Sequence, residues 1–510
     1  MAFEDRIKDH EKRTKRAAAM GGPDKLKRRK NAGLLNARER VAYLLDPDSF
    51  RESGLFGVSY IPEMRDQTPA DGKVTGFGTI DGRRAGVVAY DFTVKGSSSS
   101  YTNNRKMSHV KEMGTLRGFP VVFLSESTGI RMPDVMGEGM GFTDEGRRFL
   151  RRRTAPWASV QLGPCFGSAA WHAVCSDFNV MRKGAVMAVS SPRMVSRAVG
   201  QDISGEDLGG WRVHAQHTGF ADAVADTDEE AIDIVKRFLS YLPSHQNEAP
   251  PVAPVPDGSD DACKKMLDLL PESPSKVYDV RKIIEAFADI GSLFEIKARY
   301  GHSLCTALIR VGGRSLGVIA NNPQFKGGAM DAQSCTKAAS FLVLCDSYNI
   351  PILHLQDQPG FMIGPEAEKQ GIIGKIINWM NALLQTTVPK FTIITRKSYG
   401  RGFINMGAAN TVEEIAAWWT TEVSFMDPRS AVAVVHGVEE KDDPKRYAEL
   451  LKEMARDGSA YDLAAVFGVK EVLDPRETRD YLIEMMDIHT SRLSGGIGEH
   501  RLEAWPTSYV

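Results

Sequence analysis

The chain has 510 residues, of which 42% are hydrophobic and 25% charged, a composition typical of a folded globular protein rather than a disordered one. Its 64 basic and 65 acidic side chains leave a net charge of −1, so the composition gives no sign of a nucleic-acid-binding protein. No apolar run approaches the ~18 residues that would span a bilayer, and the charged N-terminus excludes a secretory signal, which predicts a cytoplasmic protein that contacts no membrane. The length predicts about two to four domains.

The first 45 residues are expected to be helical and separate from the following domain. Residues 1–30 hold 11 basic and 5 acidic side chains, a local excess of +6. Such a charge run is usually a solvated helix face. The functional interpretation is attraction of a polyanionic substrate tail, such as a nucleotide phosphate.

The chain contains an internal repeat. Residues 82–89 match residues 313–320, and residues 120–124 match residues 351–355, both at an offset of 231. A later match, from Pro192 to Pro428, has an offset of 236. Two equal offsets followed by a small drift indicate a tandem duplication.

A proline-rich stretch separates the two copies. Residues 249–275 contain several prolines and the acidic run 257–261, and we expect a surface linker there. The predicted N-terminal half covers residues 1–248 and the C-terminal half residues 276–510. Within each half, short apolar runs alternate with segments of helical period, which predicts an α/β fold with buried parallel strands.

One glycine-bearing turn follows an apolar strand in each half. The turns cover residues 163–170 and 397–403, and each leads from a strand into a predicted helix. Glycine lets a ligand approach the backbone closely, and the first amides of a helix have no partner within the helix. The turns are therefore candidate oxyanion holes for a thioester that becomes an enolate, although the same pattern also suits turns needed only for packing.

Other catalytic patterns are absent. The sequence contains no phosphate-binding loop. His214 and His217 form only a weak metal-site pattern, and His172 and His354 are interpreted as core or rim residues. Six cysteines include no CxxC pair, which favours reduced, buried thiols. We therefore expect no metal and no protein nucleophile.

Seven segments, taken in order, resemble the carboxyltransferase (β) subunit of biotin-dependent acyl-CoA carboxylases of the propionyl-CoA carboxylase type. Each segment is a weak match alone, but their order along nearly the whole chain is specific. They are residues 35–41, 91–98, 163–165, 206–210, 357–361, 388–397 and 467–479.

The resemblance implies two tandem crotonase-like ββα-superhelix domains. The first would bind an acyl-CoA, and the second half of a neighbouring subunit would bind biotin. The implied activity moves a carboxyl group from carboxybiotin to the α-carbon of the acyl-CoA through an enolate. The alternative is a biotin-independent acyl-CoA decarboxylase or hydrolase on the same fold, and a further one is a non-catalytic scaffold.

The resemblance also implies site residues. The main-chain groups of Gly167 and Ser168 would hold the thioester oxygen, and those of Arg401 and Gly402 would hold the biotin ureido oxygen. The residues implied for the substrate and CoA are Gly96, Ser97, Ser98, Gly129, Ile130, Arg131, Phe166 and Ile404.

The implied partners follow from what the chain lacks. No Met-Lys-Met biotin-attachment motif and no ATP-binding signature are present. Biotin and its ATP-dependent carboxylation would therefore reside on a separate biotin carboxylase/biotin carrier α subunit. The resemblance further implies a homo-oligomer, commonly a hexamer.

Both turns depart from the pattern of the family. Residues 166–168 read Phe-Gly-Ser where the family favours Ala-Gly-Gly, and residues 400–404 carry an arginine and an isoleucine in place of a glycine and a carboxylate. The changes indicate an altered acyl substrate, a relative that no longer uses biotin, or neutral drift. Arg401 keeps a usable amide only if its φ is negative.

Overall fold

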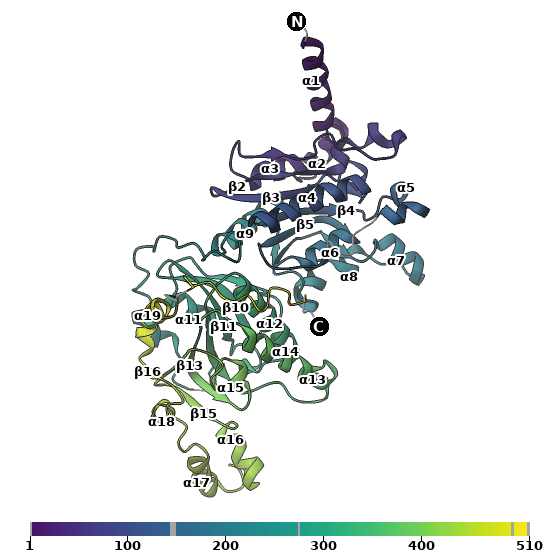
Figure 1. Cartoon of the computed structure of the whole chain (residues 1–510). Helices are drawn as coiled ribbons and strands as arrows, with labels where there is room; N and C mark the ends of the chain where they lie inside the picture. The colour runs from purple at the N-terminus through teal and green to yellow at the C-terminus, as the bar shows by residue number, and fades with distance from the viewer. Residues whose placement is uncertain (1–2, 143–148, 274–275, 491–493, 507–510) are drawn as a thin grey trace. The chain divides into compact units, whose positions relative to one another are not determined.

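The computed structural model describes residues 3–142, 149–273, 276–490 and 494–506. The chain divides into two compact units, Met1–Asn247 and Glu248–Val510 (Figure 1). Each unit contains one eight-stranded sheet covered by helices. The α/β fold with two tandem domains is therefore confirmed.

The first sheet runs in the order β1-β2-β3-β4-β5-β6-β8, with β7 paired to β5. The strands β3 to β6 are parallel, whereas β1 to β3 form antiparallel pairs. Every residue of β4 is buried, as expected for a parallel strand covered on both faces. The strands are β1 Arg51–Glu52, β2 Lys73–Ile80, β3 Arg83–Tyr90, β4 Val121–Ser127, β5 Trp157–Phe166, β6 Phe178–Arg182, β7 Val186–Ala188 and β8 Ala223–Ala225.

Helix α4 packs on the middle of the first sheet, because a side chain at Gly86 would meet Val110 of α4 at 2.8 Å. Helix α9 packs on β6, where Phe238 stacks on Phe178 with the ring centres 4.3 Å apart. The helices are α1 Glu4–Ala18, α2 Pro23–Asn31, α3 Ala37–Leu44, α4 Tyr101–Arg117, α5 Met132–Val135, α6 Ser168–Cys175, α7 Pro192–Val199, α8 Gly205–Gly209 and α9 Asp228–Tyr241.

The N-terminal segment is not separate from the first unit, contrary to the expectation from its sequence. Arg40 on α3 is fully buried and bonds to Glu126 at 2.7 Å and to Asp228 at 2.8 Å. Arg29 on α2 reaches the same Glu126 at 2.8 Å. A buried carboxylate needs such partners, so α2 and α3 are part of the domain. Helix α1 buries none of its residues, which agrees with a solvated helix.

The second sheet repeats the order of the first: β9-β10-β11-β12-β13-β14-β16, with β15 paired to β13. The register is repeated as well, since Gly86 pairs with Val121 and Gly317 pairs with Ile352, both pairs being shifted by 231. The expected duplication is thus present in the topology. The strands are β9 Phe294–Ile296, β10 Leu304–Val311, β11 Arg314–Asn321, β12 Ile352–Gln358, β13 Lys390–Tyr399, β14 Glu414–Trp418, β15 Glu422–Ser424 and β16 Glu471–Leu473.

The core of the second unit includes part of the segment expected to be a linker. Cys263 and Met266 are buried in the same cluster as Ile284 and Leu353. Of residues 249–275, those up to 273 are described and belong to the second unit, which begins at Glu248. Residues 249–257 are mostly exposed, as expected of a linker, whereas Cys263 and Met266 are packed into the core. The helices of this unit are α10 Met266–Leu269, α11 Val280–Phe287, α12 Ala332–Ser347, α13 Pro365–Lys369, α14 Ile372–Gln385, α15 Gly402–Asn405, α16 Pro428–Ala431, α17 Pro444–Met454, α18 Ala460–Ala465 and α19 Thr478–Thr490.

The six cysteines are free thiols, five of them buried and Cys175 half-buried. Across the ranges that the structure describes, no helix combines the length and the apolar character needed to cross a bilayer.

His354 is a core residue, as its place beside an apolar strand predicts. It is fully buried in β12, and burial lowers its pKa to about 3, so the ring is neutral in the folded protein at ordinary pH. The unfolded chain takes up the proton near the ordinary histidine pKa of 6.5 and the folded chain does not, so stability is lost as the pH falls below 6.5.

Replacing His354 with leucine is therefore expected to flatten the acid side of the stability profile. Between pH 6.5 and pH 5 the variant should lose less stability than the wild type, by on the order of 2 kcal/mol. Thermal unfolding over this pH range measures the difference. The control is His217→Leu at an exposed position, and equal slopes in wild type and His354→Leu would contradict the assignment.

Candidate active site

The two glycine turns occupy equivalent positions in the two units. Gly167 connects β5 to α6 with φ +60°, and Gly400 follows β13 with φ +66°. Both values lie in the left-handed region that favours glycine. The amide of Gly167 donates to Val189 O at 3.3 Å, and that of Gly400 donates to Ser424 O at 3.1 Å. Each glycine is therefore held to the neighbouring short strand and shapes its turn.

The amide of Gly167 was expected to donate to the thioester oxygen, but in the structure it donates to Val189 O instead. The next residues, Ser168 and Arg401, are the equivalent pair. Ser168 is the first residue of α6, and Arg401 precedes α15 with φ −71°. Within the described ranges, neither main-chain N–H has a hydrogen-bond acceptor. The negative φ means that an arginine fits at position 401 without backbone strain.

A second turn lies beside the first one in the N-terminal unit. A side chain added to Gly167 would meet the Cα of Gly129 at 4.0 Å. Ser99 donates to Gly129 O at 2.7 Å and accepts from the amide of Arg131 at 2.8 Å. These two bonds flank Ile130, so the N–H of Ile130 points away from Ser99. The amides of Ile130 and Ser168 thus come from two adjacent turns at the carboxyl ends of β4 and β5.

The second unit repeats this arrangement at Gly360 and Phe361, which the sequence analysis did not assign to the site. Met330 donates to Gly360 O at 3.1 Å and accepts from the amide of Met362 at 2.8 Å. Phe361 is therefore the counterpart of Ile130. Phe361 lies 231 residues after Ile130, the same offset that revealed the duplication. This offset alone could have identified Phe361 as the counterpart of Ile130.

Two unpartnered amides on neighbouring turns can hold a negatively charged oxygen. In the first unit, helix α6 adds the positive end of its dipole at Ser168. Each such donor stabilises an oxyanion by about 2.7–4 kcal/mol in comparable sites. Each unit therefore has main-chain groups suited to one developing negative oxygen.

The predicted substrate-binding residues of the first unit lie together, but several of their polar groups are already used. Ser97 donates to Gly72 O at 2.8 Å, and Ser98 donates to Lys95 O at 2.7 Å. Arg131 is buried and paired with Asp71 at 2.5 Å. These contacts show that the three side chains help to hold the loop in place. Arg131 needs this pairing, because a buried cation without a partner is costly.

The remaining predicted residues surround the turns. Gly96, with φ +62°, lies so close to Thr128 that an added side chain would meet it at 2.6 Å. Phe166 is buried and adjoins Gly129. Arg401 and Ile404 line a cavity of about 540 Å³ in the second unit, together with Gly400. Arg401 is exposed, whereas Ile404 is half-buried.

Two glutamines on β12 hold the turn of the second unit, and the sequence analysis did not identify them. Gln358 donates to Ser398 Oγ and to Tyr399 O, both at 3.1 Å. Ser398 donates to Gln356 Oε1 at 2.6 Å, and Gln356 donates to Met406 O at 2.7 Å. The chain is thus fixed on both sides of Gly400 to Asn405. Such a buried network has no signature in sequence, because it depends on three segments meeting.

Gly402 is confined by this network. A side chain at this position would begin 2.5 Å from Gln358 Oε1 and 2.7 Å from Met330 Cε. Gly402→Val is expected to lower the free energy of unfolding by about 1–3 kcal/mol because the site is already filled. Chemical denaturation measures this loss. Gly374→Val, on a helix position with open space around it, is the control and should cost far less.

Two of the histidines considered in the sequence analysis are engaged in hydrogen bonds to main-chain oxygens. His214 bonds to Met187 O at 2.7 Å, and His172 bonds to Ser168 O at 2.7 Å. In the described part of the chain, no three histidine, cysteine or acidic side chains gather as metal ligands.

The family model described as carboxyl transferase domain matches residues 28–495. The propionyl-CoA carboxylase beta chain of Roseobacter denitrificans is 35% identical over 474 residues, covering 91% of this chain and 93% of the relative. The methylmalonyl-CoA decarboxylase subunit alpha of Veillonella parvula is 32% identical over 493 residues, covering 95% of this chain and 95% of the relative.

A solved structure has the same fold. The transcarboxylase 12S crystal structure, described as a hexamer assembly with methylmalonyl-coenzyme A and methylmalonic acid bound, superposes with a TM-score of 0.89 at 32% identity. The match covers 96% of this chain and 95% of that one. The similarity thus extends over both units.

Proposed function

The chain belongs to the carboxyl transferase domain family and is an acyl-CoA carboxyltransferase, and from this premise we propose that it moves a carboxyl group from carboxybiotin to the α-carbon of an acyl-CoA. The observation that carries the proposal is the pair of equivalent turns, one per unit, each with main-chain donors free of internal acceptors among the described residues. Two such turns suit two oxygens that become negative during one reaction.

The first unit holds the thioester in this proposal. The amides of Ile130 and Ser168 donate to its carbonyl oxygen, which gains negative charge when the α-carbon loses a proton. The bonds strengthen as the enolate forms, so the transition state is held more tightly than the ground state. Burial of Phe166 beside Gly129 removes water from one side of this oxygen.

The second unit holds the ureido group of biotin. When bound there, carboxybiotin would supply the carboxyl group as CO₂, and its ureido group would then take up the α-proton of the acyl group. The amides of Arg401 and Phe361, with Gly402 close by, donate to the ureido oxygen. The cavity of about 540 Å³ beside Arg401 and Ile404 suits a neutral bicyclic ring with one polar edge. No side chain of this protein is needed as a base, which agrees with a site built from main-chain groups.

We further propose that the protein forms a homo-oligomer, a hexamer like the transcarboxylase 12S assembly, and works with a biotin carboxylase/biotin carrier α subunit. Helix α14 supports the oligomer, since Ile373, Ile377 and Leu384 are 65%, 54% and 57% exposed. Apolar side chains exposed along one helix favour a protein contact. The acyl-CoA site of one subunit would then meet the biotin site of its neighbour.

The assay uses the purified chain with methylmalonyl-CoA or malonyl-CoA, with and without free biotin. We expect loss of the carboxyl group to depend on biotin. Equal consumption without biotin would support the second candidate, a biotin-independent decarboxylase or hydrolase. If the protein bound no CoA thioester, the remaining alternative would be a non-catalytic scaffold.

A further inference from the structure

A buried lysine and a buried histidine from two different helices meet next to the turn of the first unit. Lys111 on α4 and His172 on α6 are 5% and 1% exposed, and Lys111 Nζ lies 2.9 Å from His172 Nε2. His172 Nδ1 in turn lies 2.7 Å from Ser168 O. The three residues therefore form a chain of hydrogen bonds that ends at the first residue of α6.

The chemistry of these groups gives the chain one direction. A lysine ammonium can only donate a hydrogen bond, so His172 Nε2 accepts from Lys111 and carries no proton. The neutral ring then has its proton on Nδ1, and this N–H donates to the carbonyl oxygen of Ser168, which can only accept. Lys111 thus selects the tautomer of His172 that bonds to Ser168.

Aromatic rings enclose the pair. The ring centre of His172 lies 4.8 Å from that of Phe149 and 5.8 Å from that of Phe123. Lys111 Nζ lies 5.9 Å from the ring centre of Phe149 and 5.6 Å from that of Trp157, and a cation is attracted to a ring within ~6 Å. Hydrogen bonds are electrostatically stronger in such surroundings than in water. The packing therefore holds both side chains in one arrangement.

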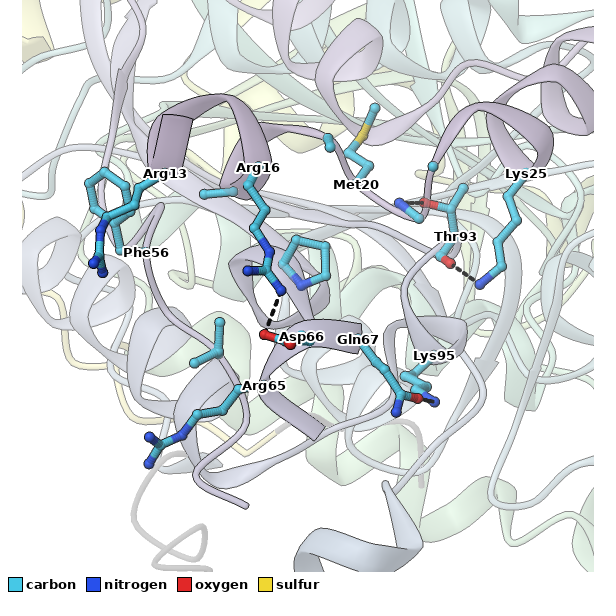
Figure 2. Close-up of a pocket in the computed structure, with 16 residues that line it drawn as sticks. Arg13, Arg16, Met20, Lys25, Phe56, Arg65, Asp66, Gln67, Thr93 and Lys95 are labelled. Atoms are coloured by element: carbon cyan, nitrogen blue, oxygen red, sulfur yellow. Dashed lines mark hydrogen bonds and ion pairs between the residues drawn. The ribbon is translucent and has the colours of Figure 1, made fainter. Parts of the chain in front are cut away.

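Other cations of the first unit are placed differently. Figure 2 shows a cavity of about 610 Å³ that is lined by Lys25, Arg65 and Lys95, all three of which are exposed. Lys111 does not line this cavity and is buried. A buried ammonium must be hydrogen-bonded, and His172 Nε2 is one of its acceptors. The charge of Lys111 therefore acts on groups inside the protein.

The direction of the Ser168 N–H depends on the peptide that joins Gly167 to Ser168. Gly167 has φ +60° and ψ −129°, and a glycine restricts the following peptide less than other residues do. Contacts of Ser168 itself must therefore fix this peptide. Its carbonyl accepts from His172, and its Oγ lies 3.0 Å from Ser99 Oγ. Ser168 is thus held both through its main chain and through its side chain.

We propose that His172, oriented by Lys111, is a positioning residue for the amide of Ser168. This inference rests on the proposed function and adds what holds its first donor in place. An amide that is fixed in advance needs no movement when the thioester oxygen becomes negative. A displacement of about 1 Å can cost about 10²-fold in rate, so the support from His172 acts on kcat.

The test measures kcat for biotin-dependent decarboxylation of methylmalonyl-CoA and, by calorimetry, the dissociation constant of propionyl-CoA. His172→Leu should lower kcat by about 10–100-fold. The dissociation constant should not change, because the oxygen gains its charge only on the way to the enolate. His172→Asn should recover most of the loss, since its side-chain amide can donate to Ser168 O from near the place of Nδ1.

The matched control is His214→Leu. His214 is also buried in the first unit and also bonds to a main-chain oxygen, Met187 O, at 2.7 Å. Its replacement removes a similar bond and a similar volume without touching Ser168, so kcat should stay near the wild-type value. Thermal unfolding of each variant shows that it is folded. Lys111→Met, which removes the donor to Nε2, is the second variant and should lower kcat by a smaller factor than His172→Leu.

A double-mutant cycle separates positioning from a general loss of structure. Ser168→Pro removes the amide itself, so the support from His172 then has nothing to act on. The kcat of Ser168→Pro/His172→Leu should therefore equal that of Ser168→Pro alone. If His172→Leu lowered kcat by the same factor in both backgrounds, His172 would not act through this amide.

Four results would overturn the inference: wild-type kcat in both folded His172→Leu and Lys111→Met, an equal loss in His214→Leu, no recovery in His172→Asn, or independent effects in the cycle. The proposed function is tested by wild type in the same assay. Wild type without biotin-dependent decarboxylation would overturn the proposed function and this inference together, whereas an active wild type with an equally active His172→Leu would overturn only the inference.

Discussion

Replacing Ser168 with proline is expected to lower kcat by about 10²–10³-fold while the protein still folds. Proline removes the amide proposed to hold the thioester oxygen. The first position of a helix accepts proline well, because its N–H has no partner within the helix. The preceding Gly167 has ψ −129°, outside the α region that a following proline disfavours. Steady-state kinetics with an acyl-CoA, together with thermal unfolding, measure the two effects.

The comparison variant is Ser168→Ala, which keeps the amide and removes only the hydroxyl contact with Ser99 at 3.0 Å. Its kcat should fall far less than that of Ser168→Pro. A folded Ser168→Pro protein with wild-type kcat would refute the assignment. Gly167→Pro is a poorer test, because proline cannot adopt φ +60° and the bond to Val189 would also be lost.

Replacing Arg401 with proline is expected to lower carboxyl transfer by about 10²–10³-fold through the second site. The φ of −71° at this position matches that of proline, so the turn is retained. The proposal places the acyl-CoA on the other unit, so its dissociation constant should not change. The measurement is biotin-dependent decarboxylation of a carboxyacyl-CoA, with acyl-CoA binding determined in parallel.

Arg401→Ala separates the two parts of the residue, because it keeps the amide and removes the guanidinium. If the amide holds the ureido oxygen, Arg401→Ala retains most of the activity that Arg401→Pro loses. If both variants lost the same activity, the guanidinium rather than the amide would be the group that matters, and the proposal would be contradicted. An unchanged rate in Arg401→Pro would exclude this amide altogether.

The structure shows how the second turn accommodates the residues at which it departs from the family pattern. The residue that needs a positive φ is Gly400, which the chain keeps, whereas Arg401 lies at a position with negative φ. Ile404 lines the cavity beside Arg401 and makes this wall apolar. The substitutions therefore change the surroundings of the second turn without removing its main-chain donors.

The candidate site was found only in part from the sequence. The two turns were identified because each follows a strand in its half, and the resemblance to the family implied Ser168 and Arg401 within them. Gly167 was assigned a ligand-binding amide, but this amide bonds to Val189, a residue of a different strand connection. Gln356 and Gln358 were missed because their partners lie 40 to 50 residues further along the chain, and side-chain networks of this kind leave no local pattern.

The sequence by itself determined the duplication, the α/β class and the place of the two turns, because these depend on local periodicity, glycine and a repeated offset. Only the tertiary structure decided which amides remain unpaired, that α2 and α3 belong to the first unit through Arg29 and Arg40, and that Lys25, Arg65 and Lys95 share one cavity. The physical reason is that hydrogen bonds and charges act between atoms close in space, whereas the order of residues constrains directly only those close along the chain.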